Sequence, residues 1–262
     1  MSSNRCDVDF AASAPETMTL TNPQFCIVIA AKDEGDNLAD TVNEIAAVMP
    51  GENFELIVVD DGSTDNTADV LRSLARQHAF LRHLVHTDNC GKSAAILSGV
   101  RAANAPVIVT MDGDGQNDPR FIPPMLARMA EPGVGLVAGQ RIKHAHSGAK
   151  RIGSRLANAL RSSLLKDSTR DTACGLKAFS KDIFLRLPYF DTMHRFLPAL
   201  VMREGLAIQH LDVTDRPRLH GASKYGMIDR ALVGVLDLFG VRWLLVRRKH
   251  IPDVREIVQD GR

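Results

Sequence analysis

Apolar and polar positions alternate in blocks along the first half of the chain. Short continuous apolar runs, typical of strands buried on both faces, are separated by stretches whose apolar residues recur at helical spacing. The runs predict strands at 25–31, 55–60, 81–86, 106–111 and 134–138. Between them we expect helices at 38–48, 64–77 (with Ser63 or Thr64 as N-cap), 91–103 and 118–129 (capped by Asp118-Pro119). This alternation predicts an α/β fold with a mainly parallel sheet and helices on both faces.

The second half of the chain is less regular. Its spacing predicts helices at 151–166, 182–187, 192–204 and 227–246, and a strand at 207–213. No internal repeat or linker divides the chain. We therefore expect a loose tail over residues 1–23, one catalytic domain over 24–226, and a C-terminal helical elaboration with a basic tail over 227–262.

Charge is distributed unevenly, although the formal net charge is only +1. This balance does not indicate a nucleic-acid partner, and we expect none. Between Pro132 and Lys166 there is no Asp or Glu. Seven basic residues lie there: Arg141, Lys143, Lys150, Arg151, Arg155, Arg161 and Lys166. A solvated helix face is one interpretation, but an acid-free stretch of this length favours a surface that faces an anion.

Four scattered cysteines form no C-x-x-C pair, so neither a disulfide framework nor a zinc site is indicated. A reducing cytosol is therefore the expected compartment. The first twenty residues carry one Arg and no continuous apolar core, which does not match a signal peptide. No uninterrupted apolar run approaches the roughly 20 residues that a spanning helix needs.

Two acidic clusters follow two of the expected strands, Asp60 to Asp65 and Asp112 to Gln116. Either cluster alone is compatible with ordinary turn chemistry. In parallel sheets, however, sites form beyond the carboxyl ends of the strands, where both clusters fall. Asp112 and Asp114 flank a glycine, so their carboxylates can converge, with Gln116 as a neutral oxygen ligand. Hard oxygen ligands suit Mg²⁺ or Mn²⁺, which would neutralise a departing diphosphate.

The order of an apolar strand, Asp33-Glu34, Asp60-Asp61-Gly62-Ser63 and Asp112-Gly113-Asp114 resembles the family-two glycosyltransferases. That resemblance implies the A-type glycosyltransferase fold and an inverting, metal-dependent transfer from a nucleotide sugar. It implies that Ala31, Glu34 and Asp61 line the pocket for the base and ribose, and that Asp112 and Asp114 hold metal and diphosphate. The first loop reads Ala-Ala-Lys-Asp-Glu and departs from the family's proline-aromatic-asparagine-glutamate pattern, which only Glu34 matches.

Further segments resemble the polyprenyl-phosphate group of that family, which includes dolichol-phosphate mannosyltransferase and the undecaprenyl-phosphate sugar transferases. The matching segments are 89–95, 171–179, 194–200 and 220–226. The resemblance implies donor-binding roles for Lys92 and Lys224, the latter on a loop bracketed by glycines. It also implies a polyprenyl phosphate as acceptor.

A lipid phosphate needs cations to hold its head group, and arginine binds phosphate bidentately. Arg141, Arg151 and Arg155 are the candidates in the acid-free stretch, with Ser154 as a hydroxyl donor. A phosphate monoester is already anionic, so positioning and charge stabilisation can replace a general base. We assign catalytic roles to Asp114, through the metal, and to Asp171, either as base or as orienter of a basic residue that binds the acceptor.

The last expected helix carries apolar residues at helical spacing and is followed by Arg247-Arg248-Lys249-His250. Asp237 and Arg242 interrupt it, which argues against a spanning helix. Trp243 beside a basic cluster is typical of an interfacial helix on an anionic membrane, and a packed core helix is the alternative. We expect a peripheral protein on the cytoplasmic face of the membrane, or one held by a membrane-anchored partner. A homo-oligomer is left open.

The leading hypothesis is therefore transfer of a sugar from a GDP- or UDP-sugar to a polyprenyl phosphate, with Mg²⁺ or Mn²⁺. One alternative is a glycosyltransferase with a soluble or protein acceptor. Another is a nucleotide-sugar-binding partner of a membrane transferase that performs no catalysis itself.

Overall fold

The structure is a computed structural model that describes residues 22–142, 161–217 and 227–247. Seven strands form one sheet in the order β3-β2-β1-β4-β6-β5-β7. Their bounds are β1 (Phe25–Ala31), β2 (Phe54–Asp60), β3 (Leu81–Val85), β4 (Val107–Asp112), β5 (Val134–Arg141), β6 (Lys177–Ser180) and β7 (Ala207–Val213). Among these described strands β6 alone runs antiparallel to its neighbours, β4 and β5. The expected mainly parallel α/β sheet is confirmed.

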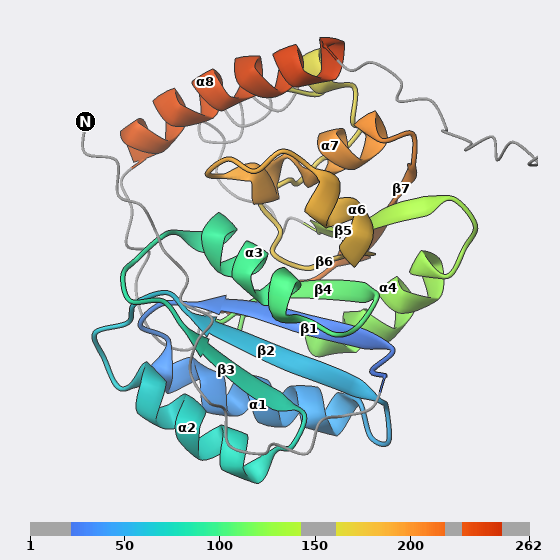
Figure 1. Ribbon diagram of the computed structural model, residues 1–262. Coiled ribbons are helices and arrows are strands. Elements are labelled where there is room, and N and C mark those ends of the chain that lie inside the picture. Colours follow the sequence, from blue (N-terminus) through green and yellow to red (C-terminus); the bar gives the residue numbers. More distant parts are fainter. Residues whose placement is uncertain (1–21, 143–160, 218–226, 248–262) are drawn as a thin grey trace, which may run out of the picture.

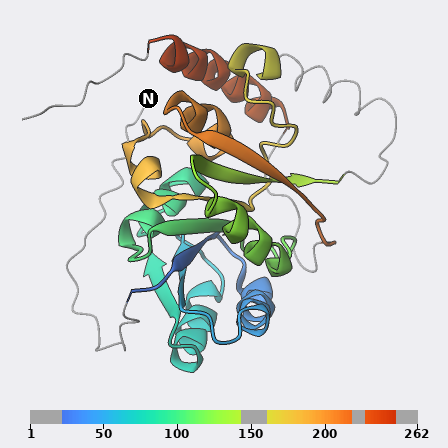
Figure 2. The ribbon, with the colours of Figure 1, turned by 90° about the vertical axis from the view of Figure 1, so that its right-hand side faces the viewer.

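Helices cover both faces of this sheet. Their bounds are α1 (Gly35–Val48), α2 (Thr67–Gln77), α3 (Lys92–Ala102), α4 (Ile122–Met129), α6 (Lys181–Arg186), α7 (Leu197–Arg203) and α8 (Met227–Val246), with short 3₁₀ turns η1 (Pro119–Phe121) and η2 (Met193–Arg195). Helices α1, α2 and α4 pack into one core cluster, and α3, α6, α7 and α8 into another. Figures 1 and 2 show α1 and α2 on one side of the sheet and α3, α6 and α7 on the other.

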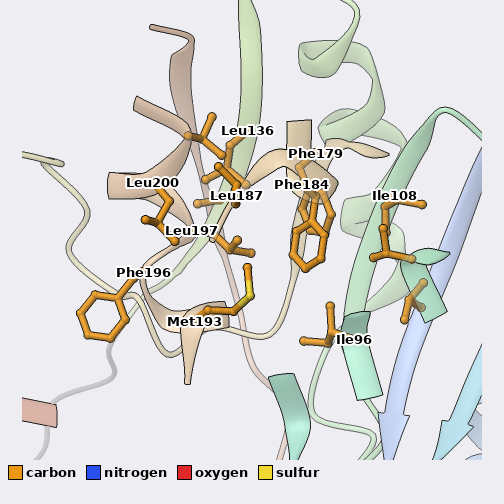
Figure 3. Packing of buried hydrophobic residues seen from close by; sticks show 14 of the residues in the cluster. Ile96, Ile108, Leu136, Phe179, Phe184, Leu187, Met193, Phe196, Leu197 and Leu200 are labelled. Carbon is orange, nitrogen blue, oxygen red and sulfur yellow. The ribbon is translucent and has the colours of Figure 1, made fainter. Parts of the chain in front are cut away.

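Alternation along β1 builds the two cores. Ile27 and Ile29 point into the cluster beneath α1 and α2, whereas Cys26 and Val28 point towards α3, because successive strand side chains face opposite ways. Figure 3 shows the α3 side, where Phe179 of β6 and Phe184 of α6 stack with ring centroids 4.9 Å apart. The short antiparallel strand is therefore anchored by aromatic packing.

Helix α3 lies unusually close to β1. A Cβ added at Gly99 would stand 2.4 Å from Val28 Cγ1, so a larger residue could not occupy this position without a shift. At the other end of the helix, Lys92 lies at the carboxyl end of β4, where its Nζ donates to Asp112.

Some boundaries differ from the sequence prediction. Helix α2 begins at Thr67 rather than Thr64, because the loop before it bonds to the loop after β1: Ser63 Oγ accepts from Asp33 N (2.8 Å) and Thr64 N donates to Asp33 Oδ1 (2.8 Å). The helix expected over 192–204 is divided into η2 and α7 at Phe196, two residues before Pro198. Strand β6 was not predicted.

Over its described side chains, residues 234–246, helix α8 packs through one face. Leu238 and Val241 are buried in the cluster with α7, and Arg203 Nε donates to the Leu244 carbonyl at 3.2 Å. In the described part of the chain no helix has the length and apolarity to cross a membrane. The helix expected over 227–246 is confirmed as α8, whereas the domain boundary expected at residue 227 stays a prediction. The tail expected over 1–23 lies almost wholly outside the described residues.

Candidate active site

Three neighbouring parallel strands bring the predicted donor residues to one edge of the sheet. In the register, Ala31 at the end of β1 pairs with Asp60 of β2, and Ala30 pairs with Asp112 of β4. The two acidic clusters therefore lie at the ends of β2 and β4, on either side of β1, at the carboxyl edge where the sequence predicted them. The N-terminus of α3 lies over the same edge (Figure 1).

Asp112 is held in its ionised form. Its carboxylate accepts from Lys92 Nζ, and its backbone N–H donates to Asn117 Oδ1 at 2.9 Å. Burial works to raise the pKa of Asp112, but the adjacent Lys92 ammonium overcomes this, and the net pKa is lowered. Asp114 is buried, and its Oδ1 accepts from Gln116 N at 3.2 Å. The loop thus presents ionised carboxylate beside a cation.

These residues fit a hard divalent metal. Asp112, Asp114 and Gln116 offer carboxylate and amide oxygens, which suit Mg²⁺ or Mn²⁺. Lys92 Nζ pairs with Asp112, so in this structure the ammonium neutralises that carboxylate. The structure therefore places Lys92 beside Asp112, and its donor-binding role stays a prediction.

Gly175 closes the site from the side of β6. A Cβ at this position would lie 2.2 Å from Asp112 Oδ1 and 2.4 Å from its Cγ. The Gly175 carbonyl accepts from Thr110 Oγ1 at 2.7 Å, which fixes the backbone in this place. Glycine is therefore required for the carboxylate to take its position.

Asp61 connects β2 to the start of α3. Its Oδ1 accepts from Cys90 N (2.9 Å) and contacts His86 Nδ1 (2.8 Å), and its Oδ2 accepts from Gly91 N (2.8 Å). Burial acts to raise the pKa of Asp61, but these hydrogen bonds, His86 first, lower it overall. His86 Nε2 in turn contacts Ser98 Oγ at 2.9 Å. Asp61 is thus an oriented anion at the rim of the expected base pocket.

Asp61 also belongs to a second group of ligand types. Within the described residues, the ligand atoms of Asp61, His86 and Cys90 lie within 4.8 Å of one another. Both oxygens of Asp61 already accept hydrogen bonds from the protein, and Cys90 is disulfide-bonded, so its sulfur is not a thiolate ligand and this group does not form a metal site.

The loop after β1 contacts the loop Asp112–Gln116. This second loop is called the metal loop below, after the cation that it is predicted to hold. Ala31 is buried, and a Cβ at Gly113 would lie 3.5 Å from its Cβ and 3.6 Å from Glu34 Cγ. Glu34 Oε2 accepts from Asn37 Nδ2 at 2.7 Å, and Glu34 N donates to Thr67 Oγ1 at 3.0 Å. The structure therefore brings Ala31 and Glu34 next to Asp112 and Asp114.

Arg141, at the end of β5, forms ion pairs with two carboxylates, those of Asp171 and Asp215. It donates to both oxygens of Asp171 (2.5 and 3.0 Å) and to Asp215 Oδ2 (3.1 Å). These contacts raise the pKa of Arg141, the Asp171 hydrogen bonds first. Burial opposes ionisation of Asp171, but the Arg141 bonds lower its pKa overall. Asp171 therefore has the geometry expected of an orienter for a phosphate-binding arginine.

The remaining predicted residues Arg151, Ser154, Arg155 and Lys224 lie outside the described residues. Arg161, another basic residue of the acid-free stretch, pairs with Asp167 at 2.6 Å, and both side chains are largely buried. This pair holds the chain that leads into Asp171.

Lys177 was not singled out from the sequence. It is buried at the start of β6, and its Nζ donates to the carbonyls of Thr172 (3.3 Å) and Cys174. Burial, reinforced by the charge of Lys92, lowers its pKa to about 8. Lys177 lies in the segment 171–179 that carries the family resemblance. A four-residue strand is too short to show alternating buried and exposed positions, so the sequence did not mark Lys177 as buried.

Comparison with known proteins agrees with this geometry. Residues 26–187 match the family described as Glycosyl transferase family 2. The chain is 34% identical over 229 residues to a dodecaprenyl-phosphate galacturonate synthase of Rhizobium johnstonii, covering 85% of this chain and 67% of that protein. It is 29% identical over 205 residues to an undecaprenyl-phosphate 4-deoxy-4-formamido-L-arabinose transferase of Edwardsiella ictaluri, covering 77% of this chain and 63% of that protein. Both relatives are polyprenyl-phosphate sugar transferases by name, and the chain spans about two thirds of their length.

Solved structures share the fold. A mannosyltransferase from Pyrobaculum calidifontis in complex with GDP-Man and Mn²⁺ superposes with a TM-score of 0.63 at 19% identity, covering 91% of this chain and 68% of that one. A glucosyl-3-phosphoglycerate synthase from Mycobacterium tuberculosis with Mn²⁺ and UDP gives 0.64 at 18% identity, covering 95% and 89%. These neighbours confirm the expected A-type glycosyltransferase fold. Together with the family match over more than half of the sequence, they identify this chain as a glycosyltransferase that belongs to glycosyl transferase family 2.

Proposed function

We propose that the chain transfers a sugar from a GDP- or UDP-sugar to a polyprenyl phosphate, with inversion and with Mg²⁺ or Mn²⁺. One observation carries the proposal. Lys177 of β6 pairs in register with both Thr110 of β4 and Ala138 of β5, so Asp112 and Arg141, which end these strands, reach the same sheet edge. The metal loop and the Arg141 guanidinium thus belong to one site. This suits a reaction that must bind both a leaving diphosphate and an incoming phosphate.

On the donor side, Asp112, Asp114 and Gln116 would hold the metal, which when bound neutralises the leaving diphosphate. Lys92 would supply a second positive charge to that diphosphate from the start of α3. Asp61, Glu34 and Ala31 would bind the nucleoside, and Lys224 the diphosphate. Complexes of the structural neighbours with Mn²⁺ and a nucleotide support this donor arrangement.

On the acceptor side, Arg141 would bind the lipid phosphate, joined by Arg151, Arg155 and Ser154. A phosphate oxygen then attacks the anomeric carbon as the bond to the diphosphate breaks, which inverts the configuration. The attacking group is already anionic, so no proton needs to be removed. Both oxygens of Asp171 are bonded to Arg141, which favours the orienter role over that of base.

The test is product formation. Purified protein, detergent-solubilised polyprenyl phosphate and a panel of radiolabelled nucleotide sugars are incubated with Mn²⁺ or with a chelator. We expect a metal-dependent lipid-linked sugar from one donor. Sugar transfer to a soluble or protein acceptor with indifference to the lipid would replace the acceptor assignment. Donor binding without transfer or hydrolysis would favour a binding partner that performs no catalysis.

We further propose that α8 holds the protein on the cytoplasmic face of the membrane. Five large apolar side chains of the helix are exposed on one face: Val235, Leu236, Phe239, Trp243 and Val246. Their spacing places them on one side, opposite the buried Leu238 and Val241. The basic run 247–250 follows at once, which suits anionic lipid head groups.

Vesicle sedimentation tests the attachment. The double variant Leu236→Lys, Phe239→Lys is expected to reduce binding to anionic vesicles at least about tenfold, because burying side chains of this size contributes about 1.5–3 kcal/mol each. The control is Val85→Lys, which changes an exposed apolar residue on the distant β3. Equal binding by the α8 double variant would refute the attachment. Loss of a dimer in that variant, without any vesicle binding by the wild type, would assign the face to a second copy.

A further inference from the structure

The segment that follows β7 runs against the metal loop. Arg216 N donates to the Gln116 carbonyl at 2.9 Å, and Gln116 Nε2 donates back to the Arg216 carbonyl at 3.3 Å. The two residues are 100 positions apart in sequence, so this pair of bonds is a tertiary contact made at the site itself. It fixes the side chain of Gln116 through the backbone of Arg216.

The Arg216 side chain holds that backbone in place. Its guanidinium spans two carboxylates, Asp118 Oδ1 at 2.8 Å and Glu44 Oε2 of α1 at 2.6 Å. Asp118 is nearly fully buried, and its Oδ1 also caps the following turn by accepting from Arg120 N at 3.0 Å. The Arg216 side chain is therefore held by Asp118, two residues after Gln116, and by Glu44 of helix α1, while its main chain bonds to Gln116.

The hydrogen bond to the Arg216 carbonyl determines which end of the Gln116 amide group faces the site. Its Nε2 group is engaged by the Arg216 carbonyl, so Oε1, the atom able to ligate a cation, is the end turned away from Arg216. We propose that Arg216 is a positioning residue that presents Gln116 Oε1 to the divalent metal. This rests on the metal site of the proposed function. Outer partners of this kind commonly change metal affinity by about 10–100-fold when removed.

The chain supplies a matched control. Arg120 also pairs with Asp118, through Nε (3.0 Å to both oxygens) and Nη2 (2.6 Å), but its side chain is 71% exposed. Removing Arg120 takes one arginine from the same carboxylate and leaves the backbone pair between Arg216 and Gln116 untouched. If Mn²⁺ affinity depended only on the positive charge beside Asp118, then Arg216→Ala and Arg120→Ala would weaken it equally.

The experiment measures Mn²⁺ affinity directly, from the free Mn²⁺ signal in electron paramagnetic resonance, with a saturating nucleoside diphosphate. Arg216→Ala is expected to raise the Kd for Mn²⁺ about tenfold, and Arg120→Ala by less than about twofold. Gln116→Ala should raise it as much as Arg216→Ala. The double variant should be no weaker than either single variant, since both remove the same ligand.

Wild-type affinity in Arg216→Ala, or effects of Arg216→Ala and Gln116→Ala that multiply in the double variant, would overturn the inference. If Arg216→Ala does not fold, Glu44→Gln decides, since it releases one anchor of the guanidinium and should raise the Kd about twofold to threefold. An unchanged Kd there would overturn the inference equally. A wild-type protein that does not bind Mn²⁺ with the nucleotide would instead refute the metal site of the proposed function.

Discussion

The two sides of the site, to which we assign the donor and the acceptor, are built in different ways. On the donor side, the parallel neighbours β1, β2 and β4 end at one edge, and short loops place Asp61, Asp112 and Asp114 there. On the acceptor side, the antiparallel β6 joins β4 to β5, and ion pairs between distant segments hold Arg141 to Asp171 and Asp215. Strand ends and short loops bring the first set of groups together, with added contacts such as Lys92 to Asp112, whereas Arg141 depends on ion pairs between distant segments. Substitutions in the two regions should therefore fail in different ways.

The largest effect is expected at Asp112. Asp112→Asn removes a metal ligand and the partner of Lys92, so kcat/KM should fall about 10³-fold, which corresponds to about 4 kcal/mol of transition-state stabilisation. Initial rates at saturating lipid measure it, with Asp69→Asn, an exposed carboxylate on α2, as control. Activity within about twofold of wild type would remove the metal from the donor side.

A purely steric change tests the same side without altering any charge. Gly175→Ala would place a Cβ 2.2 Å from Asp112 Oδ1, and the carboxylate must shift. Displacement of about 1 Å at a catalytic group costs about 10²-fold in rate, so kcat should fall by that order. The matched control is Gly240→Ala in α8, where an added Cβ meets nothing within 4 Å. Equal rates in the two variants would show that the crowding around Asp112 is irrelevant to turnover.

On the acceptor side, a substitution of Asp171 separates two roles for this residue, an orienter of Arg141 and a general base. If it orients Arg141, Asp171→Asn should raise the KM for the lipid phosphate about tenfold and leave kcat within about threefold, as expected for weakened charge-assisted hydrogen bonds. A general base would instead lose about 10²–10⁴-fold in kcat. Steady-state kinetics with varied lipid separate these outcomes. Asp212→Asn, which removes the exposed partner of Arg170 on β7, is the control.

The smallest effect concerns acid stability of the metal loop. Burial acts to raise the pKa of Asp118, but bonds from Arg120 and Arg216 lower it to about 2. A folded-state pKa below the unfolded value of about 3.9 stabilises the protein above that value, and this contribution is lost as the pH falls towards 2. Complete protonation of Asp118 would remove at most about 3 kcal/mol, and only part of that is lost above pH 2.

Denaturant unfolding with a chelator, at pH 6 and at the lowest pH that keeps the fold, measures this loss. Asp118→Asn should lose less free energy of unfolding than wild type between the two conditions. Parallel losses in both proteins would place the acid sensitivity elsewhere.

The same contrast explains what the sequence predicted. The donor side followed from local patterns: buried apolar runs, acidic residues at their ends, and Asp112-Gly113-Asp114 in one turn. On the acceptor side, Arg141 and Asp171 were named, but their bidentate pairing was not, since it depends on β6 lying between β4 and β5. The four-residue β6 has too few positions to show alternation and begins with the buried Lys177. Arg216 carries no local signal, because its partners come from α1 and from the metal loop.

The central claim is that one edge of the sheet handles two phosphates with separate groups, and binding measurements on Arg141→Lys test it most directly. The variant keeps a positive charge between Asp171 and Asp215 but loses the planar fork that binds phosphate bidentately. By calorimetry, its affinity for a short-chain prenyl phosphate should fall at least about tenfold, while that for Mn²⁺ with nucleoside diphosphate stays within about threefold. Unchanged affinity for the prenyl phosphate, or an equal loss for both ligands, would contradict the account.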